Sequence, residues 1–255
     1  MKILILLVLC TSTYANSFYT SGELNILTGT LTDYELKQEL QLISSKAQIE
    51  NEYREAKWFL YTDVYLEQDK KGRYFIEDVY CEKKFFNNAG PESLPRGSKT
   101  NIEHSWPQSK FSKEFGKYLQ KGDLHHLFIA NSKANHARSN FNFGEVESYF
   151  NTHGHCENAG LGLLVDTPDY VASSSNEHYE PPKKIRGNIA RALFYFSVRY
   201  KKKINDTQEY FLKKWHREDP VDDKDRNRNT RIMKIQGNRN PFVDYPSLVD
   251  RIKNF

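Results

Sequence analysis

The chain has 255 residues, of which 38% are hydrophobic and 27% charged, and its formal net charge is +4. Its 16 Tyr and 16 Phe supply enough large side chains for a sizeable core, which excludes a wholly disordered chain. After the first dozen residues no run approaches the roughly 20 apolar positions of a membrane-spanning helix, so we expect no integral membrane body. The small positive excess alone is weak support for a polyanionic partner.

The N-terminus has the pattern of an export signal. Lys2 gives a short positive region, an apolar run follows from Ile3 to Cys10, and Thr13-Tyr14-Ala15 forms a small-residue cleavage site. We predict a signal peptide over residues 1–15, one domain over residues 16–255, and a periplasmic or secreted location. A buried N-terminal strand and a lipoprotein signal at Cys10 are the alternatives.

The predicted cleavage changes the cysteine count. Cys10 leaves with the signal, so Cys81 and Cys156 remain. Two cysteines in an exported protein favour a disulfide, and two buried thiols are the alternative.

In chain order, the residue pattern predicts an α+β fold, mostly helical around a small antiparallel sheet. Thr32-Asp33-Tyr34-Glu35 resembles a capping box and predicts a long helix that ends near Trp58. Runs of aromatic and branched residues then predict a hairpin, and Gly and Pro predict a loop. The predicted ranges are strands at 61–66, 73–81, 101–106 and 123–129, loops at 87–99 and 171–182, and helices at 131–138, 185–203, from 206, and 226–236.

Candidate site residues concentrate between positions 100 and 146. Adjacent residues on a strand point to opposite faces, so Glu103 and His104 can face one ligand only if the strand ends or twists there. Pro107 favours such an end. Asn131, Asn135 and Arg138 have the i, i+4, i+7 spacing of one helix face.

These residue types predict a particular chemistry. The carboxylate of Glu103 and the amide oxygen of Asn135 suit Mg²⁺ or Ca²⁺, and Mg²⁺ takes few protein ligands and keeps several waters. His104, left uncoordinated, is a suitable base for deprotonating water near pH 7. A base beside a hard cation is the arrangement that phosphodiester hydrolysis requires.

Five segments, in matching order over residues 50–245, resemble the bacterial endonuclease I family, whose members are periplasmic or secreted nucleases of the ββα-metal (His-Me finger) superfamily. The segments are NIEHSWPQSKF, DLHHLF, SKANHARSNFNFGEV, IRGNIARALFYFSVRY and MKIQGNRNPFVDYP. The resemblance implies that His104 is the general base and that Glu103 and Asn135 hold Mg²⁺, with Mn²⁺ or Ca²⁺ as substitutes. It also implies cleavage of DNA and RNA with little sequence preference, leaving 5′-phosphate ends, and a disulfide between Cys81 and Cys156.

The sequence departs from better-known periplasmic members in one stretch. Residues 109–122 lack their longer insertion and its phosphate-contacting arginine, and contain lysines but no arginine. We therefore predict that Arg138 contacts the phosphate. Four further residues are candidates for supporting roles, among them a carboxylate for which a structural role is favoured and two histidines of which at most one should face the site. They are Asp123, His125, His126 and Asn131.

The predicted function is that of a monomeric, Mg²⁺-dependent, non-specific endonuclease that binds the nucleic-acid backbone, without a protein partner and without membrane insertion after signal cleavage. One alternative is a non-catalytic extracellular nucleic-acid-binding protein on the same scaffold. The other is a His-rich metal-handling protein that binds Zn²⁺ through His125, His126 or His155.

Overall fold

The computed structural model describes residues 18–86, 88–95, 99–149, 156–165 and 177–255. The signal peptide predicted over residues 1–15 lies outside these ranges, and the predicted loops at 87–99 and 171–182 are described only in part. Within the described ranges, no helix combines the length and the apolar character needed to cross a membrane.

Helices predominate and the strands are short, which confirms the α+β prediction. The α-helices are α2 (Ser21–Thr28), α3 (Asp33–Ser45), α4 (Tyr53–Phe59), α5 (Lys117–Lys121), α6 (Ser132–Arg138), α7 (Arg186–Arg199), α8 (Asp206–Glu218), α9 (Asp223–Gln236) and α10 (Pro241–Asp244). A π-helix, η1, spans Leu60–Val64, and 3-10 turns are η2 (Gln108–Lys110), η3 (Leu124–His126), η5 (Lys183–Ile185) and η6 (Pro246–Arg251).

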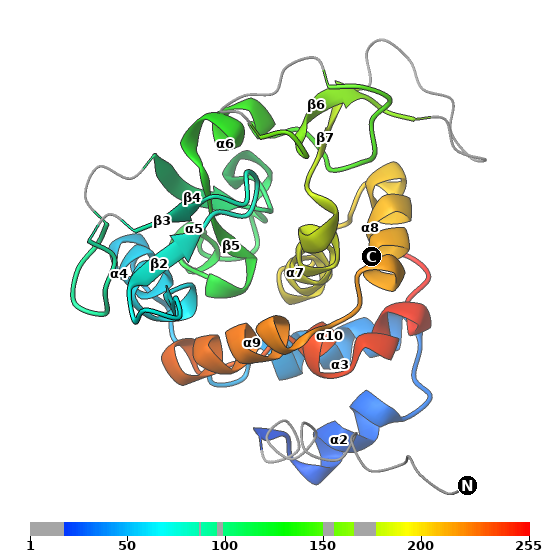
Figure 1. Cartoon of the computed structure of the whole chain (residues 1–255). Coiled ribbons are helices and arrows are strands. Elements are labelled where there is room, and N and C mark those ends of the chain that lie inside the picture. The colour runs from blue at the N-terminus through cyan, green and yellow to red at the C-terminus, as the bar shows by residue number, and fades with distance from the viewer. Residues whose placement is uncertain (1–17, 87, 96–98, 150–155, 166–176) are drawn as a thin grey trace, which may run out of the picture.

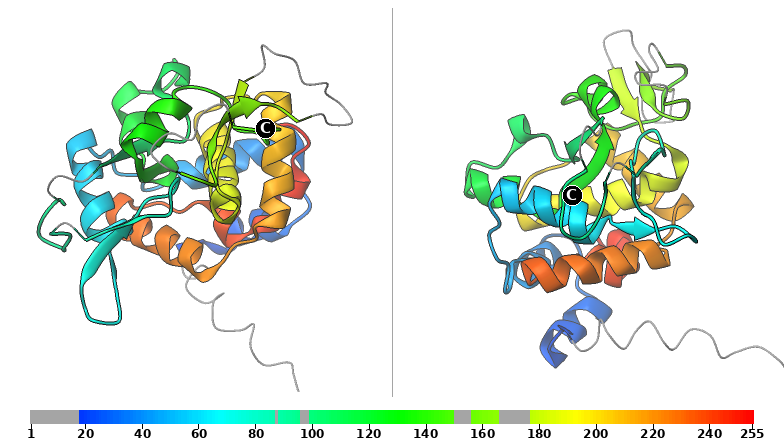
Figure 2. Two further views of the ribbon diagram at one scale, coloured as in Figure 1. Left: turned by 45° about the horizontal axis from the view of Figure 1, so that its top comes forward. Right: turned by 60° about the vertical axis from the view of Figure 1, so that its left-hand side comes forward.

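The strands described form three small antiparallel sheets rather than the single sheet predicted. They are β1 (Glu67–Gln68), β2 (Tyr74–Glu77), β3 (Lys84–Phe85), β4 (Thr100–His104), β5 (Leu127–Asn131), β6 (Gly160–Leu163) and β7 (Glu177–Glu180). The sheet orders are β1-β2-β3, β4-β5 and β6-β7. The β1–β2 hairpin projects from the body of the molecule (Figure 2, left).

Helix α7 is the centre of the larger hydrophobic core. Of its 14 residues, all but Asn188 are buried. The helix is therefore surrounded by protein on every side, whereas an amphipathic surface helix buries only one face. It packs against α3, α8, α10 and the η3 turn. Figure 1 shows it between α8 and the part of the molecule that contains β4, β5 and α6.

A smaller core lies beneath the β4–β5 pair. Ile102 of β4 and Leu127 and Ile129 of β5 pack there with Leu60 of η1 and Ile232 of α9. Because residues on a strand alternate between its two faces, this packing fixes the register of the pair, in which Ile102 lies opposite Ile129 and His104 opposite Leu127. The two short strands are thus held firmly enough to position side chains at their ends.

Three sequence predictions were wrong at the level of elements. The helix expected from 33 to 58 is two helices, with a break in which Ala47 adopts a left-handed φ of 57°. Residues 61–64, expected to begin the strand 61–66, lie instead in the π-helix Leu60–Val64 that continues α4. Thr32 is the N-cap of α3, but its side chain makes no capping hydrogen bond.

Candidate active site

Strand β4, the η2 turn and helix α6 line an open cavity of about 510 Å³. Strand β4 ends at His104, so Glu103 and His104 both line this cavity although they are adjacent in sequence. Helix α6 starts directly after β5, because the Asn131 side chain caps it by accepting hydrogen bonds from the backbone N–H groups of Lys133 and Ala134. Asn131 is therefore a helix cap and Asn135, one turn on, lines the cavity.

Hydrogen bonds define the protonation state of the His104 ring. Its Nε2 lies 3.2 Å from the carbonyl oxygen of Lys121, and since a carbonyl only accepts, Nε2 carries the proton. The other nitrogen, Nδ1, is then an acceptor, and the Gln108 amide donates to it at 3.4 Å. The neutral imidazole thus presents a lone pair at Nδ1.

Neighbouring rings keep His104 neutral and in place. Tyr53 stacks on it with ring centroids 5.6 Å apart, and His126 packs edge-on with ring centroids 5.5 Å apart. Burial lowers the pKa of His104 to about 3, and the nearby His126 acts in the same direction.

Arg138 lies beneath the cavity and binds protein groups. Its Nη1 is 2.8 Å from Oε1 of Glu103, and the guanidinium donates to the carbonyl oxygens of His104 and Ser105 while it stacks on Phe143 at 4.4 Å. The side chain is only 2% exposed. Burial raises the pKa of the Glu103 carboxyl, and Arg138 opposes that shift. Three protein oxygens hold the guanidinium, and Arg138 also lines the cavity, so the predicted phosphate contact stays a prediction.

Asn135 is oriented by its neighbours on β4. Its Nδ2 donates to Oδ1 of Asn101 at 2.7 Å and to the carbonyl oxygen of Ile102 at 3.2 Å. Both amide hydrogens are thereby used, so Oδ1 is the group that this side chain offers to the cavity. Within the described ranges, no group of three or more His, Cys, Asp or Glu side chains could hold a metal ion. A sparse oxygen site of one carboxylate and one amide, as in Glu103 and Asn135, is the donor set that fits Mg²⁺.

The two histidines after Asp123 were predicted to alternate on a strand, and that prediction was wrong. They belong to the η3 turn, which Asp123 caps by accepting from the His125 N–H, and both are fully buried. Burial lowers the pKa of each imidazole to about 4. His126 packs against His104 and donates from Nε2 to the carbonyl oxygen of Gln120, whereas His125 donates to that of Asn238. Only His126 therefore touches the candidate base.

Asp123 is the centre of a buried polar network. Besides the η3 cap, its carboxylate accepts hydrogen bonds from Gln48, Gln236 and the hydroxyls of Tyr195 and Tyr200, at 2.7–3.1 Å. Burial by itself raises the pKa of the carboxyl, but the nearby histidines and these donors outweigh it and hold the pKa below its ordinary value. The favoured structural role of Asp123 agrees with this position.

Two residues that contact the His104 ring were not predicted. Gln108 stands in the same Glu-His-Ser-Trp-Pro-Gln run, four residues after His104, and the η2 turn brings its amide back to the ring. Tyr53 comes from α4, far away in sequence, and no local pattern indicates its position.

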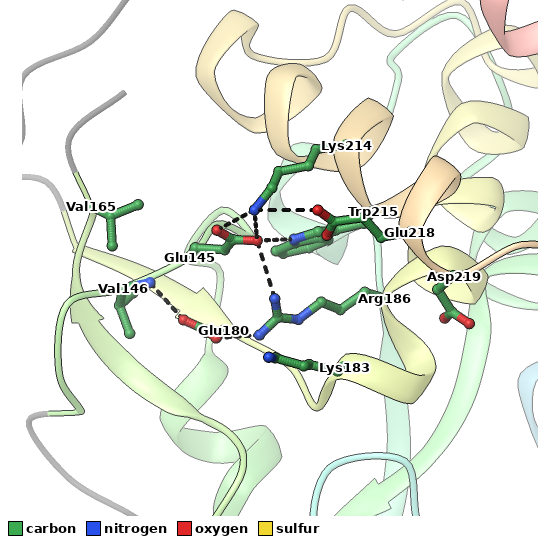
Figure 3. Close-up of a pocket in the computed structure, with 10 residues that line it drawn as sticks. All are labelled: Glu145, Val146, Val165, Glu180, Lys183, Arg186, Lys214, Trp215, Glu218 and Asp219. Atoms are coloured by element: carbon green, nitrogen blue, oxygen red, sulfur yellow. Dashed lines mark hydrogen bonds and ion pairs between the residues drawn. The ribbon is translucent and has the colours of Figure 1, made fainter. Parts of the chain in front are cut away.

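A second charged cavity, of about 530 Å³, lies among β7, α7 and α8 (Figure 3). Its side chains satisfy one another: Glu145 accepts from Lys214, from Trp215 and from Arg186, which also pairs with Glu180. The described residues that line it include four carboxylates and three cationic side chains. This network ties β7 to the helical body and is separate from the His104 cavity.

Residues 81 and 156 are joined by a disulfide that closes a 75-residue separation, as predicted. Cys156 is buried against the larger core. His155, one of the histidines proposed for zinc, lies outside the described residues.

A sequence model of the family described as Endonuclease I matches residues 32–247 of the chain. An extracellular ribonuclease of Bacillus subtilis is 33% identical over 171 residues, which cover 60% of this chain and 53% of that protein. An extracellular deoxyribonuclease of Aeromonas hydrophila is 36% identical over 134 residues, or 52% of each chain. Endonuclease-1 of Buchnera aphidicola (Acyrthosiphon pisum strain APS) is 29% identical over 123 residues, covering 48% of this chain and 44% of that protein.

The chain thus spans about half the length of the curated relatives it matches. Names such as extracellular and periplasmic deoxyribonuclease support the predicted periplasmic or secreted location. Because the family match extends over most of the sequence and includes every residue of the His104 cavity, the chain belongs to the endonuclease I family.

Proposed function

We propose that this protein is an exported, Mg²⁺-dependent endonuclease that hydrolyses phosphodiester bonds of DNA and RNA. The observation that carries the proposal is the state of His104. A neutral imidazole, with its proton on Nε2 and its lone pair on Nδ1, lines an open cavity together with the side chains of Glu103 and Asn135.

His104 would act as the general base. The attacking water replaces the 3.4 Å contact of the Gln108 amide at Nδ1 and gives its proton to that nitrogen. The Nε2–H bond to the Lys121 carbonyl supports the positive charge that the ring then carries. The low pKa of the free site suits a neutral resting ring. A bound phosphate is an anion close to the ring, so it raises this pKa and strengthens the base when substrate is present.

Glu103 and Asn135 would hold the cation, which is Mg²⁺ or, in its place, Mn²⁺ or Ca²⁺. When bound, the cation stabilises negative charge on the phosphoryl and leaving oxygens. Asn101 orients the amide of Asn135, and Arg138 orients the carboxylate of Glu103, so the two ligands are fixed before the cation arrives. Arg138 is a positioning residue in this mechanism.

The substrate would be recognised through its sugar-phosphate backbone. One relative is named a ribonuclease and another a deoxyribonuclease, which supports action on both nucleic acids by one scaffold. Backbone contacts carry no sequence information, so cleavage has little sequence preference. We further propose a monomer, secreted or periplasmic, without a protein partner.

The decisive experiment is digestion of supercoiled plasmid by the purified mature protein, with Mg²⁺ and with EDTA. His104→Ala removes the base, and Lys133→Ala, at an exposed position of α6 that is not among the residues lining the cavity, is the control. We expect nicking that requires Mg²⁺, is lost in His104→Ala and is retained in Lys133→Ala. Binding of plasmid without cleavage by any form would favour the non-catalytic binding protein. Cleavage that survives His104→Ala would show that the base is misassigned.

A further inference from the structure

A third cavity, of about 660 Å³, adjoins the candidate active site. Pro107 and Ser109 line both cavities, so the two meet at the start of η2. One wall of this cavity, which we call the lysine groove, is the segment 105–114, and the other contains the connection between α7 and α8. The cationic side chains along it are Lys110, Lys113, Lys201, Lys202 and Lys203.

The lysine groove is strongly positive. Among the described residues that line it, five are lysines and one, Glu114, is acidic, which gives a net charge of +4. The whole chain has a formal net charge of +4, so this one surface carries an excess equal to that of the entire molecule. The cavity of Figure 3 differs in this respect, because its carboxylates outnumber its cations.

Two of these ammonium groups are available to a ligand. Lys113 and Lys201 are exposed, lie on opposite walls, and have no side-chain ion pair or hydrogen bond within the described part of the chain. Lys203 pairs with the exposed Asp206, and Lys110 donates to the Asn142 amide. Many other charged side chains of the described chain are paired within the protein. The two unpaired ammonium groups therefore fit a surface whose negative counter-charge comes from another molecule.

The walls of the lysine groove are held together beneath the lysines. Trp106 stacks on Phe196 of α7 with ring centroids 4.9 Å apart, and its Nε1 donates to the carbonyl oxygen of Lys110. On the other wall, the Ser197 hydroxyl donates to the carbonyl oxygen of Lys202, and Lys202 N–H donates back to the carbonyl of Ser197. The spacing of the two rows of lysines is therefore set by the core.

We infer that the lysine groove binds the backbone of the substrate strand next to the scissile bond, with its phosphates against Lys113 and Lys201. This inference rests on the proposed function and deepens it. The groove makes the enzyme selective for polymers over small diesters, because only a strand several nucleotides long reaches both the catalytic cavity and the lysines. A fourth cavity shares the three consecutive lysines at 201–203 and adds Lys37 together with the acidic Glu39.

The test compares two double variants that each remove two exposed positive charges. Lys113→Gln/Lys201→Gln changes the lysine groove, and Lys70→Gln/Lys71→Gln changes the tip of the projecting β1–β2 hairpin. Each is assayed for kcat/KM on a single-stranded 20-nucleotide DNA and on bis(p-nitrophenyl) phosphate, which fits the catalytic cavity alone. At 0.1 M salt we expect the groove variant to lose about 10-fold or more on the 20-mer. It should lose less than about 2-fold on the small diester, and the hairpin variant less than about 2-fold on either substrate.

Binding of the labelled 20-mer, measured in a His104→Ala background, tests the groove independently of catalysis. The slope of log Kd against log salt should fall by about 0.7 for each groove lysine removed, the value for a single strand, and stay unchanged in the hairpin variant. Equal losses in the two double variants, in cleavage or in binding, would contradict the inference that the strand binds in the lysine groove. If the wild type cleaves neither substrate, the proposed nuclease function fails, and the binding slopes still decide whether the groove holds a strand.

Discussion

The guanidinium of Arg138 is the contact through which α6 fixes the carboxylate of Glu103. We expect Arg138→Gln to lower the free energy of unfolding by about 3–5 kcal/mol, because it leaves a buried carboxylate without its cation. Nuclease activity should fall with it, since Glu103 loses its orientation. Urea unfolding at pH 7 measures the change, and Lys133→Gln, on an exposed position of the same helix, is the control. A stability loss below about 1 kcal/mol would contradict the assigned pairing.

Buried histidines make the fold sensitive to acid. His125 and His126 have pKa values near 4 in the folded chain, whereas an unfolded histidine titrates near about 6.5. Between these values the unfolded chain binds more protons, so stability is full above about pH 6.5 and falls as the pH drops toward 4. We expect a loss on the order of 3 kcal/mol between pH 7 and pH 5. Urea unfolding at both pH values tests this. Equal stability at the two pH values would refute it.

The candidate site was predictable from sequence only where its residues lie close together. Glu103, His104 and Asn135 fall within 33 consecutive positions, and strand and helix periodicity brings them to one cavity. The buried pairing of Arg138 was not predictable. Its partners are one carboxylate and two backbone carbonyls, and they come together only after β4 and α6 pack. Tyr53 likewise reaches His104 through tertiary structure alone.

At the scale of elements, the η3 turn is held by a helix more than 100 positions later. Gln236 of α9 is fully buried, accepts from the Leu124 N–H at 2.7 Å and donates to Asp123 at 2.8 Å. Gln236→Leu keeps the volume but leaves both groups without this partner, and we expect a loss of about 2–4 kcal/mol. Gln38→Leu, on an exposed face of α3, is the control. Thermal and urea unfolding of both variants give the comparison, and equal stabilities would contradict the role of Gln236.

The elements that sequence predicted best are those with local stop signals. Gly237 ends α9 in the left-handed conformation, with a φ of 86°, and Asn131 starts α6 as its cap. The failures lack such signals. Residues 60–64 have the aromatic and branched composition of a strand, yet they continue α4 because Leu60, Tyr61 and Val64 pack into the smaller core. Tertiary packing outweighed local propensity there.

For the whole molecule, the Cys81–Cys156 disulfide is the covalent constraint on the unfolded state. Closing a loop of 75 residues contributes on the order of 4 kcal/mol in the chain-entropy account. Reduction should therefore lower the melting temperature by roughly 10 °C in a chain of this size. Calorimetry with and without dithiothreitol measures the shift, and Cys81→Ala/Cys156→Ala should melt at the reduced temperature in both buffers. An identical melting temperature with and without reductant would disprove this contribution.

Because α9 holds the η3 turn, the turn can take its final structure only after α9 has been synthesised. Arg228 donates to the carbonyl oxygens of Leu124, His125 and Leu127, and Gln236 closes the same turn from the other end of the helix. A growing polypeptide that already contains His104, Glu103 and Asn135 still lacks these donors until α9 has been made. The turn that supports the candidate base is therefore completed only after α9, and an interrupted chain that ends before α9 carries the chemical groups of the candidate site without that support.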